Sequence, residues 1–345
     1  MGGAQTQLLG LVRAAAEDGF WEPSVLAMAP GEFEGDFRRL GIPVTVLRRR
    51  GSPGLGRLFK LNRTISNGHF DLVNSHLWHA NAYSRLAVLG RRRPPYVVIV
   101  EHNLEVHRQA WRRLVDRPLA SRADGCVAVT GAMAAFLLRM HPFDSASLTH
   151  IPYAIDRSVF HPESPQSSRI SRVGGLGRLV PEKGWNVLLD AVRRLGDEGV
   201  DLEVEIGGVG PLREQLESDA DGLPVRFVGM IPAGSAVADW LRTLDAFVLP
   251  SLHREARPVV VLEALATGLP VVATEIPGMA ETLGGGGVAV PPGDDEALAA
   301  AIVRVLDDST ERNRSLEAAS AIPDFKELAR RYADLFTRTV QSGDR

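Results

Sequence analysis

The sequence predicts an α/β protein with two doubly wound domains, each built on a parallel sheet, and three observations lead to this fold class. Short β-branched runs alternate with amphipathic helical patterns nearly throughout, which is the arrangement of successive βα units. The chain has 345 residues, of which 45 % are hydrophobic, and this length suits about two domains. A proline- and serine-rich stretch, HPESPQSSRIS, begins at residue 161 and indicates a linker between them.

Six strands are expected before this linker. Each is a short apolar run bounded by turn residues, and a helical pattern separates it from the next. In order, they cover residues 24–29, 43–47, 71–76, 96–100, 125–130 and 148–153.

The start of the chain is unusual for this fold. Gly2 and Gly3 are followed at once by a helical pattern, and such a glycine pair normally lies in the turn after a strand. No strand pattern precedes them, so the first domain is expected to lack its first strand. We interpret Met1 as a start assigned too late; the alternatives are that another segment replaces the strand, or that the chain no longer folds into a working enzyme.

Six further strands follow the linker. They cover residues 172–177, 202–208, 225–230, 246–251, 270–274 and 287–292. After Pro323, apolar residues recur at helical spacing and predict a terminal helix. The expected organisation is a first domain over residues 1–160, a second over 161–322 and a C-terminal helix over 323–345.

Composition and charge exclude several classes of protein. The longest apolar runs are strand-sized and no secretory signal opens the chain, so we expect a cytoplasmic protein. Cys126 is the only cysteine, which excludes a disulfide within the chain. The formal charge is +7 over residues 1–160 and −10 over the remainder, so an anionic partner is expected at the first domain. We expect no nucleic-acid partner.

The segment GLGRLVPEKGWNVLLDAVRRL, residues 175–195, carries the first chemical motif. A strand runs into a turn with Arg178 and Lys183, and a helix begins after Gly184. Two cations beside free backbone N–H groups could hold a diphosphate. The lysine precedes its glycine and no Ser or Thr follows, so this is not a Walker A loop. The structural alternative is two solvated surface charges.

The segment from residue 250 to residue 281 carries the second motif. Glu255 lies in a loop and Glu263 lies eight positions later in the following helix. An ionised carboxylate accepts hydrogen bonds from two neighbouring sugar hydroxyls, so this pair suits a sugar ligand. A glycosidase also uses two acids, but it has no use for the diphosphate site upstream.

These segments resemble, in order and spacing, the C-terminal half of the GT-B glycosyltransferases of family four, over residues 170–306. Glu255 and Glu263 match the E-x7-E element of that family. The resemblance implies two Rossmann-like domains facing a cleft, with a nucleotide-diphosphate sugar as the donor. It places Arg178 and Lys183 on the donor diphosphate, Glu263 on the ribose hydroxyls and Glu255, as a catalytic residue, near the transferred sugar.

The resemblance extends to other parts of the chain. The segment Ala256, Arg257, Pro258 and Val259 would bind the donor through backbone N–H groups, although relatives have a glycine and an aromatic residue where this chain has Ala256 and Arg257. His102 is similar in position to an active-site histidine of the family. Gly3 resembles part of its first glycine loop, which approaches the donor phosphates.

No metal or other cofactor is expected. His76 and His79 lack further ligands nearby, and Asp219-Ala220-Asp221 falls at a helix end although it formally spells a metal motif. Basic side chains are already available for the phosphates. The co-substrate is expected to be the nucleotide-diphosphate sugar itself.

A basic amphipathic stretch covers residues 48–65. Its arginines and lysine alternate with apolar residues, as in helices that lie on anionic lipid. If so, the protein is peripheral at the inner membrane face; the alternative is a helix that packs its apolar side on the sheet. The expected acceptor is a glycan or a lipid-linked molecule.

Together these motifs predict a retaining glycosyltransferase of polysaccharide or glycolipid biosynthesis. A nucleotide-sugar epimerase would explain the phosphate site but not so well the two glutamates. A non-catalytic relative that only binds nucleotide sugar would explain the unusual start.

Overall fold

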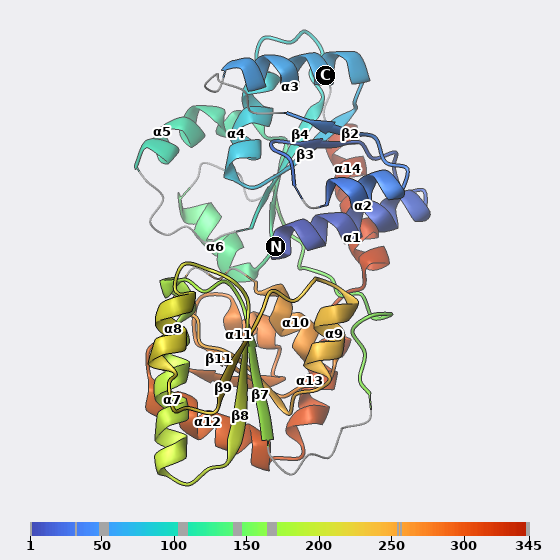
Figure 1. The fold of residues 1–345 in the computed structure, drawn as a ribbon. Helices are drawn as coiled ribbons and strands as arrows, with labels where there is room; N and C mark the ends of the chain where they lie inside the picture. The colour runs from blue at the N-terminus through green and yellow to red at the C-terminus, as the bar shows by residue number, and fades with distance from the viewer. Residues whose placement is uncertain are drawn as a thin grey trace. The chain divides into compact units, whose positions relative to one another are not determined.

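The structure of the chain is a computed structural model. It describes residues 2–31, 33–47, 55–102, 110–140, 147–163, 171–253, 255 and 257–342. The chain forms two compact units, one of residues 1–154 with 323–345 and the other of residues 155–322 (Figure 1). The twelve strands expected from the sequence are present and pair in parallel, which confirms the α/β class.

The first unit contains two parallel sheets. Its strands are β1 (Val25–Ala27), β2 (Val44–Val46), β3 (Leu72–His76), β4 (Tyr96–Glu101), β5 (Gly125–Ala128) and β6 (Leu148–His150). β1 pairs with β2, and β3 to β6 form a four-stranded sheet in sequence order. Among the described residues, no pairing joins β1 to β3.

Helices pack on these sheets, and the last of them returns from the end of the chain. They are α1 (Gly3–Glu17), α2 (Glu34–Arg39), α3 (Leu55–Gly68), α4 (Trp78–Ala87), α5 (Ala110–Leu119), the short η1 (Ala120–Arg122), α6 (Gly131–Met140) and α14 (Phe325–Ser342). α14 packs against α1 so closely that a Cβ atom on Gly10 would lie 2.2 Å from the Phe325 ring. The expected terminal helix is therefore part of the first unit.

The second unit is a doubly wound domain. Its strands are β7 (Ser171–Leu176), β8 (Leu202–Gly207), β9 (Val225–Gly229), β10 (Ala246–Leu249), β11 (Val271–Thr274) and β12 (Gly287–Val290). They form one sheet in the order β12-β11-β10-β7-β8-β9. Every residue of β10 and β11 is buried, as expected for central parallel strands that are covered on both faces.

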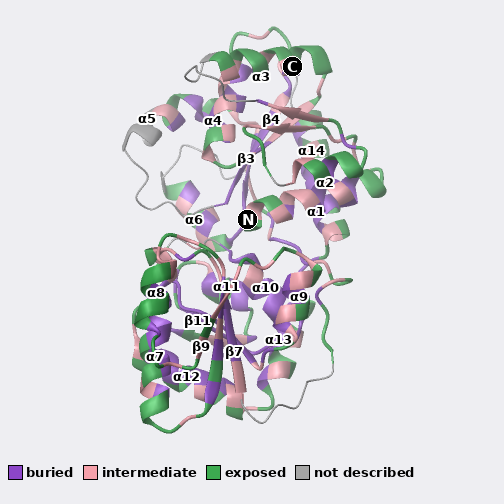
Figure 2. Cartoon of the chain, in the orientation of Figure 1, coloured by how far each residue is buried: buried purple, intermediate pink, exposed green. Residues whose placement is uncertain are grey.

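The helices of the second unit supply that cover. They are the short η3 (Pro181–Lys183), α7 (Trp185–Asp197), α8 (Arg213–Asp219), α9 (Ser235–Leu241), α10 (Val259–Ala266), α11 (Met279–Leu283), α12 (Asp295–Asp307) and α13 (Glu311–Ser320). Figure 2 shows buried residues along the sheet and on the helix sides that face it. No helix within the described part of the chain has the length and apolar character needed to cross a membrane.

Candidate functional site

Two loops of the second unit meet at one edge of its sheet. The chain winds from β7 through β8 to β9 in one direction and from β10 through β11 to β12 in the other. The winding therefore reverses between the neighbouring strands β7 and β10. In doubly wound folds, ligands bind at the carboxyl ends of the strands beside such a reversal. The loops that follow β7 and β10 carry the two motifs recognised in the sequence.

Backbone contacts hold these two loops together. Leu252 N donates to Glu182 O at 2.9 Å. Gly184 has a φ of 65°, and a Cβ atom there would lie 2.2 Å from Pro250 O, so only glycine fits. The distance between the loops is thus fixed by their main chains.

The lysine of the first loop contacts the acid of the second. Lys183 Nζ forms an ion pair with Glu255 Oε1, and each side chain is 15 % exposed. The fully buried Ser251 donates its hydroxyl to the same carboxylate oxygen at 3.0 Å. Strand order therefore brings together two residues that are 72 positions apart in the chain. Sequence reasoning overlooked Ser251, although it directly follows the predicted strand and its short side chain is a hydrogen-bond donor.

Arg178 lies in the loop after β7, but its side chain is exposed. Its backbone carbonyl accepts a hydrogen bond from Trp185 Nε1 at 2.9 Å, which ties the loop to the start of α7. Within the described part of the chain, no recorded contact joins its guanidinium to Lys183 or Glu255. The structure thus leaves Arg178 accessible at the same edge.

Glu263 lies on α10, and its side chain is buried. Burial disfavours the charged carboxylate and raises its pKa from 4.5 to about 7. The group is therefore partly protonated near neutral pH. No recorded contact among the described residues joins Glu263 to Glu255, so the two acids of the motif lie in different surroundings.

The segment before α10 is buried. Arg257, Pro258 and Val259 are all inaccessible or nearly so. Arg257 Nη1 donates to Glu281 Oε1 on α11 at 3.2 Å, so this side chain is engaged with a neighbouring helix. Ala256 lies outside the described residues. The expected backbone contacts of this segment with a donor stay predictions.

The raised pKa of Glu263 predicts how stability depends on pH. Between pH 4.5 and about 7 the folded protein keeps a proton that the unfolded chain releases, so this group's contribution to the free energy of unfolding falls as pH rises. Glu263→Gln removes that dependence. The free energy of unfolding of the variant minus that of the wild type is therefore expected to increase by roughly 3 kcal/mol from pH 4 to pH 8.

Urea unfolding of both proteins at several pH values measures this difference. The titration of other groups, including the buried histidines, is common to both proteins and cancels. Glu296→Gln is the matched control, because its side chain is 80 % exposed and its replacement should leave the difference flat. A flat difference for Glu263→Gln as well would show that Glu263 is ionised in the folded protein.

In the first unit, two histidines lie at the carboxyl ends of neighbouring strands. Asn74 donates its amide N–H to Val98 O at 3.2 Å, so its Oδ1 accepts from His76 Nε2 at 2.7 Å. His76 Nδ1 therefore accepts from His102 Nε2 at 2.9 Å. His102 Nδ1 then accepts from the Tyr153 hydroxyl at 2.6 Å. One directed chain of hydrogen bonds thus fixes the tautomer of both rings.

Both histidines are neutral near pH 7. Burial lowers the pKa of His76 to about 4, and burial together with the neighbouring His76 lowers the pKa of His102 well below its usual value. His102 is 5 % exposed, and both of its ring nitrogens are bonded within the unit. Sequence reasoning placed Tyr153 at the end of an expected strand and did not give it this role.

A small cavity adjoins this chain of hydrogen bonds. It is lined by Gln7, Leu8, Leu11, His76, His102, Ile151, Pro152, Tyr153, Leu328 and Tyr332. Gln7 Nε2 donates to Ala154 O at 2.8 Å, and Gln7 Oε1 accepts from Ala154 N at 2.9 Å.

Gly3 begins α1 and is exposed. Within the described residues, no three His, Cys, Asp or Glu side chains are grouped to hold a metal ion.

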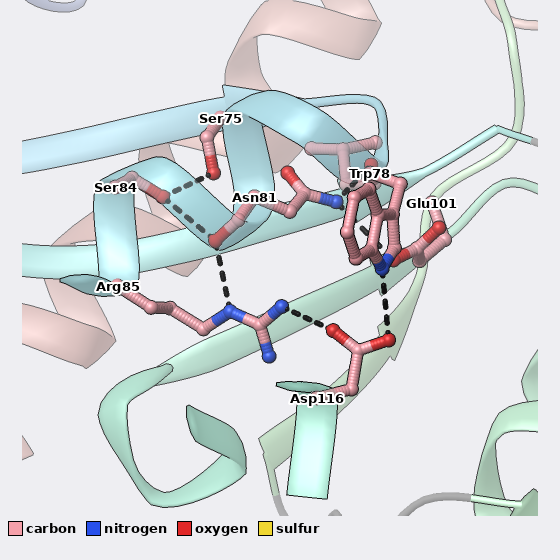
Figure 3. Close-up of polar contacts among 8 residues, drawn as sticks. Ser75, Trp78, Asn81, Ser84, Arg85, Glu101 and Asp116 are labelled. Atoms are coloured by element: carbon pink, nitrogen blue, oxygen red, sulfur yellow. Dashed lines mark hydrogen bonds and ion pairs between the residues drawn. The ribbon is translucent and has the colours of Figure 1, made fainter. Parts of the chain in front are cut away.

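A buried polar cluster joins side chains of β3, α4, β4 and α5 (Figure 3). Arg85 on α4 is 1 % exposed and pairs with Asp116 on α5 at 2.6 Å. Asp116 also accepts from Trp78 Nε1 at 2.9 Å. Asn81 donates to Glu101 at 3.2 Å and to the β4 backbone. Sequence reasoning missed this cluster, because nothing in the local pattern pairs an arginine with an aspartate 31 positions away.

The cluster supports a strained turn. Leu77, between β3 and α4, has a φ of 72° and a ψ of 150°, a region that is nearly restricted to glycine. Its carbonyl accepts from Asn81 N at 2.9 Å, and the neighbouring Trp78 is held by Asp116. These contacts keep the residue after His76 in its unusual conformation.

Comparison with known proteins matches both halves of the chain to sugar-transferring enzymes. Residues 1–159 match the family described as Glycosyltransferase Family 4, and residues 171–308 match the family described as Glycosyl transferases group 1. A phosphatidyl-myo-inositol mannosyltransferase of Mycobacterium leprae is 30 % identical over 307 residues, which cover 86 % of this chain and 78 % of that protein.

Another relative matches a shorter region. A GDP-mannose-dependent alpha-(1-6)-phosphatidylinositol dimannoside mannosyltransferase of Mycobacterium tuberculosis is 33 % identical over 207 residues, or 56 % of this chain. The alignment spans 51 % of that relative, about half of its length.

Solved structures share the fold at low sequence identity. HepE of Anabaena, solved with UDP and glucose, has a TM-score of 0.82 at 20 % identity, covering 97 % of this chain and 96 % of its own. The sucrose-phosphate synthase of Thermosynechococcus elongatus has a TM-score of 0.81 at 20 % identity, covering 99 % of this chain and 94 % of its own. Both likenesses show the two-domain, Rossmann-like architecture.

Proposed function

The chain belongs to the group 1, family 4 glycosyltransferases of GT-B fold, and on this premise we propose that it transfers a hexose from a nucleotide-diphosphate sugar with retention of configuration. The acceptor in this proposal is a lipid-linked molecule or a glycan. The relatives named above are mannosyltransferases of phosphatidylinositol derivatives, which supports this acceptor class and makes GDP-mannose the first donor to test.

One observation carries the proposal. Lys183 and Glu255, which the resemblance assigns to the diphosphate and the sugar of one donor, are in contact at the point where the winding of the second unit reverses. A cation beside a carboxylate suits a ligand that joins a phosphate to a sugar. The exposed Arg178 lies on the same loop as Lys183, where its guanidinium is accessible to the phosphates of a donor.

The proposed mechanism places charge stabilisation at the leaving group. Lys183 and Arg178 stabilise the negative charge that grows on the diphosphate as its bond to the sugar breaks. The acceptor oxygen forms its bond to the same sugar carbon from the same face, and its proton passes to the leaving phosphate oxygen. Glu255 binds hydroxyls of the transferred sugar, and Glu263 binds those of the ribose.

The proposal assigns the acceptor to the first unit. The +7 charge of residues 1–160 favours an anionic acceptor there. His102 is a proposed catalytic residue at this side. Because it is neutral and already donates through Nε2 to His76, it acts by position and polarity and not as a cation.

Contact with an anionic membrane is part of the proposal. Residues 48–54 of the basic stretch lie outside the described residues. In α3, Leu58, Leu61 and Ile65 pack inward, so this part of the helix covers the sheet. Phe59 is 71 % exposed beside the exposed Lys60, a combination that suits the lipid surface. Sedimentation with anionic but not neutral vesicles is the expected result.

The experiment that tests the function is a donor and acceptor screen. UDP- and GDP-sugars are titrated calorimetrically into the protein, and products formed with membrane extract are identified by mass spectrometry. Binding of an activated sugar and a glycosylated lipid or glycan product are expected. Conversion of the donor without an acceptor would instead indicate an epimerase, and binding without any product would indicate a non-catalytic relative.

A further inference from the structure

We propose that Glu255 is a built-in anion that occupies Lys183 until the diphosphate of the donor displaces it, and that this exchange frees the carboxylate to bind the donor sugar. The inference rests on the proposed function and adds an order of events to it. Phosphate binding and sugar recognition then become one coupled step.

The pair seen in the structure is the state before exchange. Lys183 Nζ contacts Glu255 Oε1, and both side chains are largely shielded from water. A diphosphate competes with the carboxylate for this ammonium, because two anions at one largely shielded cation repel each other. Binding of the phosphates to Lys183 therefore favours the departure of Glu255.

Only side chains need to move. The main chains of the two loops are joined by the Leu252–Glu182 hydrogen bond and by the close approach of Gly184 to Pro250. Lysine and glutamate both have flexible stems, whereas the hydrogen bond and the close approach hold the two main chains a short distance apart. The exchange is thus a change of rotamers on a fixed frame.

Ser251 keeps the displaced carboxylate at the site. Its hydroxyl donates to Glu255 Oε1 at 3.0 Å, independently of Lys183. Its own position is fixed, because the Thr274 hydroxyl donates to the Ser251 backbone carbonyl. After exchange, Glu255 retains this partner and gains free lone pairs for sugar hydroxyls.

The exchange has a consequence for selectivity. A nucleoside diphosphate without its sugar must break the Lys183–Glu255 pair, and it has no sugar hydroxyls that could donate hydrogen bonds to the released carboxylate. A nucleotide sugar supplies hydroxyls in place of the ammonium. The pair therefore favours the intact donor over the spent nucleotide, and its return after transfer helps to expel the product.

Calorimetric titration with inorganic pyrophosphate, UDP and GDP tests the proposal on the full chain. Glu255→Gln is expected to bind the nucleoside diphosphate at least fivefold more tightly than the wild type. In the Lys183→Met background the same replacement should produce no gain. The ratio of affinities for nucleotide sugar and nucleoside diphosphate should fall in Glu255→Gln. Circular dichroism and thermal melts verify that each variant is folded.

Glu275→Gln is the matched control for a general charge effect. Glu275 is an exposed acid just after β11, at the same edge of the sheet, and its replacement removes one negative charge without touching the pair. An equal gain in this control, or a gain that persists without Lys183, overturns the exchange. So does an unchanged or weaker affinity in Glu255→Gln. If no activated sugar, nucleoside diphosphate or pyrophosphate binds at all, the proposed function fails and the exchange fails with it.

Discussion

Replacing Lys183 with methionine is expected to lower kcat/KM for sugar transfer by about 10²- to 10³-fold. Removing one preorganised donor that faces developing charge typically has this effect, because the group acts most strongly in the transition state. Methionine keeps much of the volume of the lysine stem and removes only the ammonium. Steady-state kinetics with the donor identified by the screen provides the measurement.

The control for this variant is Lys326→Met. Lys326 lies on α14, is 59 % exposed and pairs with Asp18 in the first unit. Its replacement should leave kcat/KM within a factor of about two, since exposed ion pairs contribute little. A Lys183→Met enzyme with more than half of the wild-type activity would contradict the assignment of Lys183 to the leaving group.

Asp116→Ala is expected to destabilise the first unit by about 3 to 5 kcal/mol. The replacement leaves the guanidinium of Arg85, which is 1 % exposed, as a buried charge without its carboxylate, and such losses are among the most costly of single changes. Trp78 loses its hydrogen-bond acceptor at the same time. The turn at Leu77 depends on the same contacts, so its strain adds to the effect.

Amide hydrogen exchange in increasing urea measures the effect and separates the two units. Glu327→Gln is the control, because its pairs with Arg330 and Arg331 are exposed, and it should cost less than about 1 kcal/mol. The double variant Arg85→Met/Asp116→Leu should recover a large part of the loss, since neither member of the buried ion pair remains in it. A small effect of Asp116→Ala would mean that water reaches Arg85.

The strands could be predicted from the sequence because their signal is local. Runs such as YVVIV and LPVVAT are almost entirely apolar, and the strands found there, β4 and β11, are almost wholly buried. The sequence also placed Lys183 and Glu255 in loops after strands. That they touch follows from β7 lying next to β10, and no local pattern encodes which strands are neighbours.

Contacts between side chains that lie far apart in the sequence could not be predicted for a similar reason. His102 was identified by resemblance, but its engagement by His76 and Tyr153 depends on how β3, β4 and the segment after β6 pack. Arg85 looked like any basic residue on a helix. Its burial results from the packing of α4 against α5, which brings Asp116 into contact with it.

The path of the chain governs how the protein can be divided. Because α14 belongs to the first unit, shortening the protein from its carboxyl end as far as residue 323 removes a helix of the first unit and no residue of the second. Residues 155–322 are contiguous, whereas the first unit is made of two segments. A stop codon just after residue 322 would therefore damage the unit whose larger segment is translated first.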